Sequence, residues 1–139
     1  MNSVYVLIIK VNKNINVNVG ALGNLNFEKG IYAYVGSAKK GLRKRIERHL
    51  RKNKRKFWHI DYLLNEGCVK VLRVFTVQKS FSECKVAEII SERGVPVQGF
   101  GSSDCKCISH LFKIGEYEFL RGFMHELSLN LFYGSEVHG

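Results

Sequence analysis

Basic side chains gather in one short stretch of the sequence, and they are the first residues whose types and spacing suggest a chemistry. Of the 22 Lys and Arg residues, 11 lie between Lys39 and Lys56, opposed only by Glu47, so this stretch carries the whole formal net charge of +10. Because dense positive charge attracts phosphates, it predicts a nucleic-acid-binding surface. A solvated helix face and attraction to an anionic lipid surface are the alternatives. The cations expected to contact nucleic acid are Lys39, Lys40, Arg43, Lys44, Arg48, Arg51, Lys52 and Arg55.

Four cysteines and a histidine form a second group. Cys105 and Cys107 begin a C-x-C-x-x-H pattern that ends at His110, while Cys68 and Cys84 precede it. Clustered Cys and His side chains suit zinc, and Cys84, Cys105, Cys107 and His110 form a candidate zinc site. C-x-C is less typical of structural zinc than C-x-x-C, so two alternatives stay open. These are a disulfide from Cys84 to Cys105 or Cys107, and free buried thiols.

The elements that must position these residues follow from hydrophobic periodicity and from glycine and serine boundaries. The expected strands are Ser3–Val11, Gly30–Gly36 and Val69–Val77, with a short further strand at Ser109–Ile114. The expected helices run from Gly41 to about Asn53, Phe57 to Glu66, Ser80 or Ser82 to about Glu92, and Glu116 to Phe132. The Asn-rich segment 12–26 predicts a loop or a short hairpin. The order predicts the α/β (α+β) class: a small mixed, mainly antiparallel three-stranded central sheet flanked by helices.

The bulk properties fit one globular domain. The chain has 139 residues, and 45% of them are hydrophobic, which is enough for a buried core. No window approaches 18 uncharged apolar residues, and the run Val4–Ile9 is too short for a signal peptide. We therefore expect a cytoplasmic monomer with no membrane partner. The domain is expected over residues 1–115, with residues 116–139 as a C-terminal helical extension of the same domain.

Several ordered motifs resemble a known family. A strand ending Y-V-G at residues 34–36 precedes a helix with L-x-x-R-x-x-x-H at residues 42–49. Together they resemble the second half of the signature of the GIY-YIG nucleases. The strings W-H-I-D-Y-L-L at 58–64, E-C-x-x-A at 83–87 and S-D-C-x-C-x-S-H-L at 103–111 extend the resemblance. The set, from about residue 3 to residue 112, resembles a prokaryotic branch of that superfamily catalogued as domain of unknown function 123.

The resemblance implies hydrolysis of phosphodiester bonds, which needs a positioned water and positive groups near the phosphate. Arg45 would bind the scissile phosphate, because a guanidinium can hold two phosphate oxygens. Tyr5 and Tyr34 would orient or deprotonate the water, with His49 or His59 assisting proton transfer. The first family motif is expected at residues 3–5 (S-V-Y), on a separate strand, rather than at the literal G-I-Y of residues 30–32. Each of these side chains also fits a structural role, as a core tyrosine, a packed histidine or one more phosphate contact.

Glu83 would bind a single Mg²⁺ or Mn²⁺ ion, since these hard cations prefer oxygen ligands. Glu88 lies five residues later on the same expected helix, on a face about 140° away, so only one of the two can face Tyr5. Glu83 is preferred because it lies in the E-C-x-x-A string. The Asn that ends the family pattern has no clear counterpart, although Gln98 and Ser103 lie nearby. The loop 99–104 offers an alternative, backbone N–H groups directed at a phosphate.

These features predict a metal-dependent endonuclease that hydrolyses DNA phosphodiester bonds in DNA repair or processing. The alternative is a catalytically inactive nucleic-acid-binding module of the same fold that assists a DNA repair enzyme. An RNA-binding or ribonuclease role, which would use the same basic helix, is a third hypothesis. Phosphate contacts carry affinity without sequence specificity, so no substrate preference is predicted.

Overall fold

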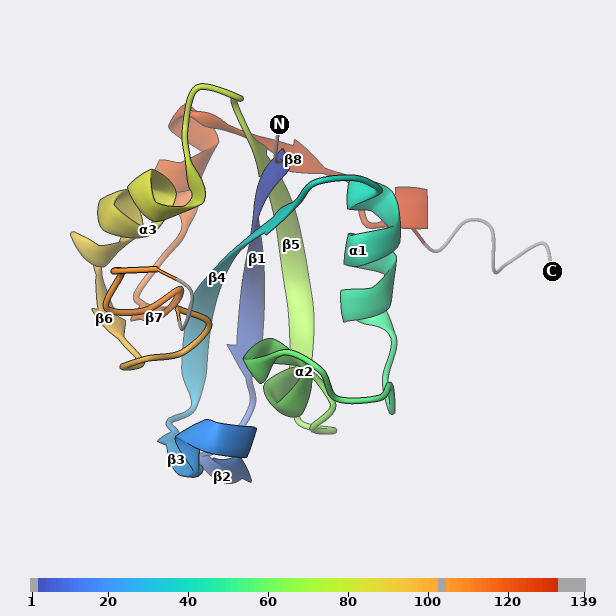
Figure 1. Ribbon diagram of the computed structural model, residues 1–139, viewed down its shortest axis with the longest axis vertical. Helices are drawn as coiled ribbons and strands as arrows, with labels where there is room; N and C mark the ends of the chain where they lie inside the picture. The colour runs from blue at the N-terminus through green and yellow to red at the C-terminus, as the bar shows by residue number, and fades with distance from the viewer. Residues whose placement is uncertain (1–2, 103–104, 133–139) are drawn as a thin grey trace, which may run out of the picture.

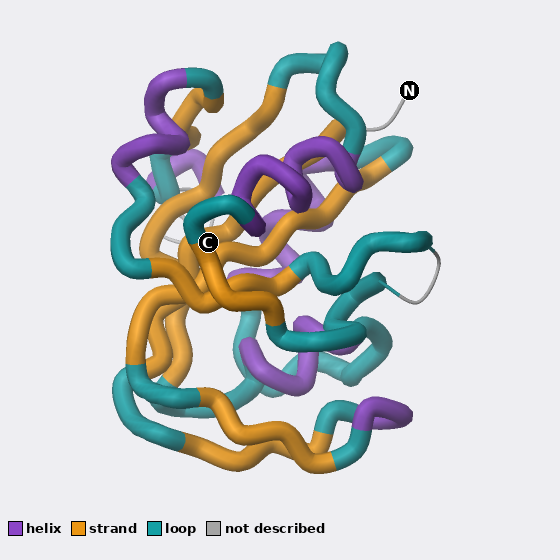
Figure 2. The backbone as a smooth tube through the Cα atoms, turned by 90° about the vertical axis from the view of Figure 1, so that its left-hand side faces the viewer, coloured by secondary structure: helices purple, strands orange, loops and turns teal. Residues whose placement is uncertain are grey.

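Six antiparallel strands form the central sheet of the protein, whose computed structural model describes residues 3–102 and 105–132. The strands lie in the order β6-β7-β4-β1-β5-β8, and every neighbouring pair is antiparallel. Their bounds are Ser3–Val11 (β1), Gly30–Ala38 (β4), Val69–Val77 (β5), Gly94–Pro96 (β6), Leu111–Ile114 (β7) and Met124–Leu127 (β8). The strands β2 (Ile15–Asn18) and β3 (Asn24–Phe27) form a separate hairpin around the 3-10 turn η1 (Gly20–Leu22). Figure 2 shows this hairpin below the main sheet.

Both faces of the sheet are covered. The helices α1 (Leu42–Leu50) and α2 (His59–Leu64) pack on one face, and α3 (Glu83–Ser91) and the 3-10 turn η2 (Glu118–Gly122) pack on the other. Figure 1 shows α1 and α3 at opposite flanks of the three long strands β4, β1 and β5. Successive side chains of a strand point to opposite faces, so β1 gives residues 5, 7, 9 and 11 to one core cluster and residues 4, 6 and 8 to the other. This double coverage explains why β1 is a continuous β-branched run without polar alternation.

The predicted α+β class is confirmed, but the prediction of three central strands is wrong. The three long strands, β1, β4 and β5, are the ones that the sequence predicts, and each has nine residues. The other three extend the sheet at its two edges and have three or four residues each. The short strand expected at Ser109–Ile114 is found as β7, whereas β6 and β8 show too few alternations to reveal a period of two.

The helix expected over Glu116–Phe132 is wrong. This segment contains η2 and then β8, which pairs with the outer edge of β5. Leu120 is buried, and Phe119 and Phe123 pack against the same cluster, so the spacing that imitates a helix comes from a 3-10 turn that leads into a strand. Residues 133–139 of the expected extension lie outside the described residues.

The other helices agree with the expectations apart from their ends. Helix α1 ends at Leu50, before Asn53, whose φ of 58° lies in the left-handed region. The hydroxyl of Ser82 accepts a hydrogen bond from the backbone N–H of Lys85 and caps α3, as the sequence predicts. Within residues 3–102 and 105–132, no helix is long and apolar enough to cross a membrane.

Candidate active site and metal centre

The pairing of β1 with β4 brings Tyr5 opposite Gly36, and a missing side chain makes room for the tyrosine. A Cβ at Gly36 would lie 2.5 Å from the hydroxyl oxygen of Tyr5, so only glycine fits there. This hydroxyl lies 2.6 Å from Nε2 of His49, which α1 presents toward the sheet. Tyr34 lies on the same face of the sheet, with its ring 6.1 Å from that of His49. The structure therefore brings together three of the predicted catalytic side chains.

Burial sets the protonation states of His49, Tyr5 and Tyr34. It lowers the pKa of His49 to about 3, so the imidazole is neutral at neutral pH. Burial also raises the pKa of Tyr5, against the opposing effect of the nearby Arg45 cation, and raises that of Tyr34 well above its usual value. Both phenols thus keep their protons in the free protein. They can orient a water molecule by hydrogen bonding, whereas the expected deprotonation by a free phenolate does not fit.

Arg45 is fixed beside this group by two contacts. Its Nη1 donates to the backbone carbonyl of Ser37 over 2.8 Å, and its guanidinium lies 4.4 Å from the ring centre of Trp58. The guanidinium of Arg48 lies 4.5 Å from the same ring centre. The indole of Trp58 therefore holds two cations by cation–π attraction, which preorganises Arg45 for an anionic ligand.

Glu83, the first residue of α3, reaches the same end of β4. Its Oε1 accepts a hydrogen bond from the hydroxyl of Ser37 over 2.9 Å. Its Oε2 lies 3.1 Å from Nδ1 of His110, an ion-pair distance at which the N–H is not aligned for a regular hydrogen bond. Burial alone would raise the pKa of Glu83, but His110, Ser37 and Arg45 hold it below its usual value. The side chain is thus a carboxylate at neutral pH.

The structure also shows which of the two candidate glutamates faces the tyrosines. Glu88 is exposed and pairs with Lys85 at 3.6 Å, while the charge of Glu83 is close enough to raise the pKa values of Tyr5 and Tyr34. Tyr32, from the literal G-I-Y string, donates its hydroxyl proton to the carbonyl of Glu28, near the start of β4. These placements agree with the geometry expected for Glu83, whose role as a metal ligand remains a prediction.

His59 is engaged with a loop rather than with Tyr5. Its Nδ1 accepts the backbone N–H of Gly101 over 2.9 Å, and its ring packs against Phe100 at 5.6 Å between ring centres. This contact indicates a structural role for His59. It also uses one N–H of the loop 99–104, which is the alternative phosphate site. The N–H groups of Gly99 and Phe100 are also bonded, to backbone carbonyls. The alternative of a phosphate held by this loop is therefore disfavoured, and its residues Ser103 and Asp104 lie outside the described residues.

Three residues of the site were not singled out from the sequence: Ser37, Trp58 and His110 as a partner of Glu83. Ser37 directly follows the Y-V-G string, and Trp58 begins the W-H-I-D-Y-L-L string, so both lay within quoted motifs. Their roles depend on a backbone carbonyl and on the face of an indole, and no residue spacing reports such contacts. The link between His110 and Glu83 joins residues 27 positions apart and appears only in three dimensions.

Two of the predicted nucleic-acid contacts are structural cations. Arg48 pairs through both terminal nitrogens with the carboxylate of Asp61, which is fully buried. The ammonium of Lys52 donates to three backbone carbonyls around the end of α2. Arg43 is exposed but is bound to Glu47 and to the carbonyl of Leu131. The exposed cations of the predicted set that have no such contact among the described residues are Lys39, Lys40, Lys44, Arg51 and Arg55.

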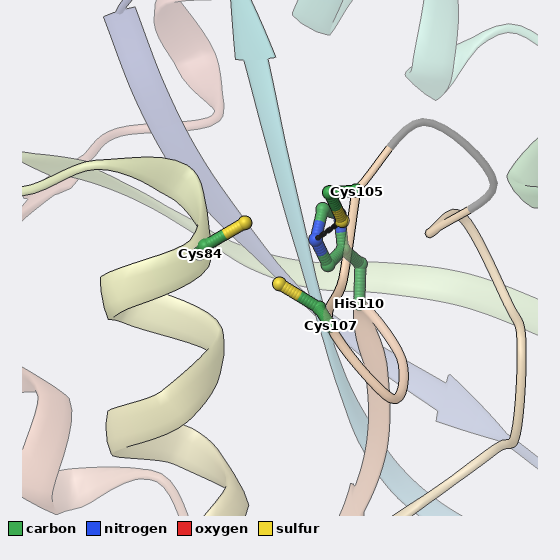
Figure 3. Close-up of side chains that lie close together, drawn as sticks. All are labelled: Cys84, Cys105, Cys107 and His110. Atoms are coloured by element: carbon green, nitrogen blue, oxygen red, sulfur yellow. Dashed lines mark hydrogen bonds between the residues drawn. The ribbon is translucent and has the colours of Figure 1, made fainter.

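The four side chains of the candidate zinc site lie together in the structure and can hold a metal ion. One ligand atom from each of Cys84, Cys105, Cys107 and His110 lies within 4.8 Å of the others. Figure 3 shows the thiols of Cys84, on α3, and Cys107, on the loop, pointing toward each other, with Cys105 beside His110. All four cysteines are free thiols, so the disulfide alternative is not found, and Cys68 does not belong to the cluster.

A cavity of about 340 Å³ borders this cluster and is lined mainly by apolar groups. It lies between α3 and the segment 106–109 and includes Cys84 and Cys107 in its wall. None of the tyrosines, Arg45 or Glu83 lines it, so it is separate from the candidate active site.

A family model described as Domain of unknown function DUF123 matches residues 4–132. The match extends beyond the motifs quoted from the sequence and includes η2 and β8. Neither a curated protein nor a solved structure matches the chain.

Proposed function

The chain belongs to the DUF123 family, and from this premise we propose that it is an endonuclease that hydrolyses DNA phosphodiester bonds with one Mg²⁺ or Mn²⁺ ion. One observation carries the proposal: Ser37, at the end of β4, binds Arg45 through its carbonyl and Glu83 through its hydroxyl. Ser37 therefore holds two groups close together: the guanidinium of Arg45, which suits a phosphate, and the carboxylate of Glu83, which suits a metal ion. The resemblance of the motifs to those of the GIY-YIG nucleases supports the same function.

The donor set fits a hard divalent cation. Glu83 is ionised, and each carboxylate oxygen has a further lone pair beyond its contact with Ser37 or His110. Mg²⁺ is commonly held by one or two carboxylates together with water and substrate phosphate. When bound, such an ion would polarise the phosphate and lower the pKa of a bound water.

The other side chains would bind and orient the reactants. Arg45 is free of any carboxylate partner within the described residues, so its guanidinium can take two phosphate oxygens. The protonated hydroxyl of Tyr34 can hold the attacking water. Tyr5, which lies deeper in the core, packs beneath this position. His49, with a pKa of about 3, is a weak base, and we assign it to positioning the hydroxyl of Tyr5.

A nucleic-acid-binding module without catalysis is the second candidate. It is favoured by the burial of Tyr5 and His49, which are only 1% and 2% exposed, and by the protein partners of both Glu83 oxygens. The two candidates make opposite predictions for DNA cleavage in the presence of a divalent metal.

The test is cleavage of plain duplex, flap and branched DNA with Mg²⁺ or Mn²⁺, and with chelator. We expect metal-dependent cleavage by the wild type and a loss of about 100-fold or more in Arg45→Ala and Tyr34→Phe, since both act on the reacting groups. DNA affinity should change by about 1 kcal/mol or less, because many other cations contact phosphates. Lys79→Ala, which removes an exposed cation outside the basic stretch, is the control and should keep its cleavage rate.

Equal losses of affinity and cleavage in Arg45→Ala would make Arg45 an ordinary phosphate contact. If the wild type cleaves none of these substrates with either metal, the binding module replaces the nuclease.

A further inference from the structure

We propose that Cys84, Cys105, Cys107 and His110 bind one Zn²⁺ ion, and that Glu83 is the outer partner that orients His110 on this ion. A zinc centre would then hold in place the carboxylate assigned to the active site. The zinc site stands on its own geometry, whereas its importance for catalysis rests on the proposed function.

The distances within the cluster match tetrahedral coordination. Zinc–sulfur bonds of about 2.3 Å and zinc–nitrogen bonds of about 2.0 Å place two sulfurs about 3.8 Å apart and a sulfur and nitrogen about 3.5 Å apart. Sγ of Cys105 lies 3.4 Å from Nε2 of His110, and the four ligand atoms lie within 4.8 Å of one another. Small side-chain rotations are enough to bring all four onto one ion. Three sulfurs and one imidazole also favour a soft ion such as zinc over Mg²⁺.

The chain around the cluster fits a metal that joins two parts of the structure. Cys84 is the second residue of α3, while the other three ligands lie on the loop segment between β6 and β7. That segment contains little regular secondary structure, so a bond from zinc to α3 would tie it to a rigid element (Figure 3).

The two nitrogens of His110 face different partners, as in a metal-bound histidine. Nε2 faces the thiol of Cys105. Nδ1 lies 3.1 Å from Oε2 of Glu83, an ion-pair contact that a small rotation of the ring onto the ion would align into a hydrogen bond. Histidines that bind metals commonly donate their other N–H to a carboxylate, which fixes the orientation and tautomer of the ring. Glu83 also receives the hydroxyl of Ser37, so one carboxylate connects the zinc ligand to the strand that carries Arg45.

This arrangement explains why a residue assigned to Mg²⁺ or Mn²⁺ directly precedes a cysteine in the sequence. Cys84 anchors the start of α3 at the zinc centre, and Glu83, one residue earlier, extends toward Ser37. Loss of zinc would release both Cys84 and His110, and Glu83 would lose one of its two fixed contacts.

The zinc site is tested on the full chain without DNA. Metal analysis of protein purified without added chelator should give one zinc per chain, and Co²⁺ exchanged into the site should show the absorption bands of a tetrahedral ion with thiolate ligands. Cys107→Ser should lose the ion. If that variant does not fold, removal and return of zinc in the wild type, followed by circular dichroism, gives the same information. Protein that binds no zinc, or a Cys107→Ser variant that binds it as well as the wild type, overturns the proposal.

The outer partner is tested by comparing Glu83→Gln with Glu88→Gln, which removes the same charge from the same helix outside the cluster. Competition with a zinc chelator should show affinity reduced about 10- to 100-fold in Glu83→Gln and unchanged in Glu88→Gln. Equal affinities in the two variants would overturn the role of Glu83. A protein that shows this zinc effect but cleaves no DNA would contradict the proposed nuclease and leave the zinc centre intact.

Discussion

His49 is a neutral imidazole buried in the core beneath α1. Its ring is 2% exposed, Nε2 is taken by Tyr5, and Nδ1 has no partner among the described residues. Burial lowers its pKa to about 3; the carboxylate of Asp61 opposes this, and three nearby cations reinforce it. Protonation of His49 would therefore place an unsolvated charge beside other positive groups.

The stability of the protein should consequently fall with pH below about 6.5, the ordinary pKa of histidine. Because the folded-state pKa is lowered, the unfolded chain binds one more proton between about pH 3 and 6.5, and acid favours unfolding. The free energy of unfolding should lose about 1.4 kcal/mol per pH unit from this residue, as measured by urea denaturation at pH 7.5, 6.0 and 5.0. His49→Gln should lack this slope, while His125→Gln, at an exposed position, should keep it. Equal slopes in wild type and His49→Gln would contradict the buried neutral histidine.

Individual site residues were predictable where a motif fixes their spacing. The resemblance to the family motifs singled out Tyr5, Tyr34, Arg45 and Glu83. The structure places all four near one end of the sheet, because the strands and helices that carry them form where the sequence predicts. Asp61 was not predictable in this way. Its carboxylate is fully buried and accepts from Arg48 and from two backbone N–H groups, contacts that depend on how a loop folds.

The segment between α1 and α2 is held by cations of the basic stretch, one of which, Arg48, was predicted to contact nucleic acid. Arg48 binds Asp61 and the carbonyl of Arg55, and Lys54 donates to carbonyls at the end of α1 and to Asn65. Asp61 in turn accepts the N–H of Trp58, which supports Arg45. The segment thus connects a buried ion pair to the candidate active site.

Arg48→Ala should therefore destabilise the fold, in contrast to substitution of an exposed cation on the same helix. Removing one partner of a buried ion pair typically costs about 3–5 kcal/mol, and Lys44→Ala should stay within about 0.5 kcal/mol. Urea denaturation at neutral pH measures both. If Arg48→Ala lowers the free energy of unfolding no more than Lys44→Ala does, Arg48 does not anchor Asp61. Arg48 would then again be a candidate phosphate contact.

Strands and helices differed in how well sequence revealed them. The long strands show as β-branched runs and the helices as apolar stripes, whereas β6 and β8 are too short to show either pattern. For β8 the error had a further cause. Phe119, Leu120 and Phe123 have helical spacing because η2 folds them onto the same cluster as α3, and only pairing with β5 makes the following residues a strand.

The charge distribution is uneven over the molecule as a whole. After the structural cations are set aside, the exposed cations of the basic stretch extend from the turn that follows Ser37 along α1 to the segment beyond it. The stretch begins two residues after Ser37, which binds both Arg45 and Glu83, so a bound duplex could contact the cations and the candidate active site together. The rest of the chain, taken together, has 11 basic and 11 acidic residues and no net formal charge.

Neutralising these cations should weaken DNA binding through its dependence on salt. Each phosphate contact adds about 0.9 to the slope of log K against log salt, so replacing Lys39, Lys40, Lys44, Arg51 and Arg55 with Gln should flatten the slope by up to about 4 to 5. The slope is obtained by fluorescence anisotropy of a labelled duplex from low to moderate salt. A matched variant that replaces five exposed lysines elsewhere, Lys10, Lys13, Lys29, Lys70 and Lys79, loses the same charge but should keep most of the slope. If the two variants flatten it equally, binding follows net charge and no defined face exists. If only the matched variant flattens the salt slope, the nucleic-acid surface lies outside the basic stretch. A bound duplex would then not run along α1 to Arg45 and Glu83.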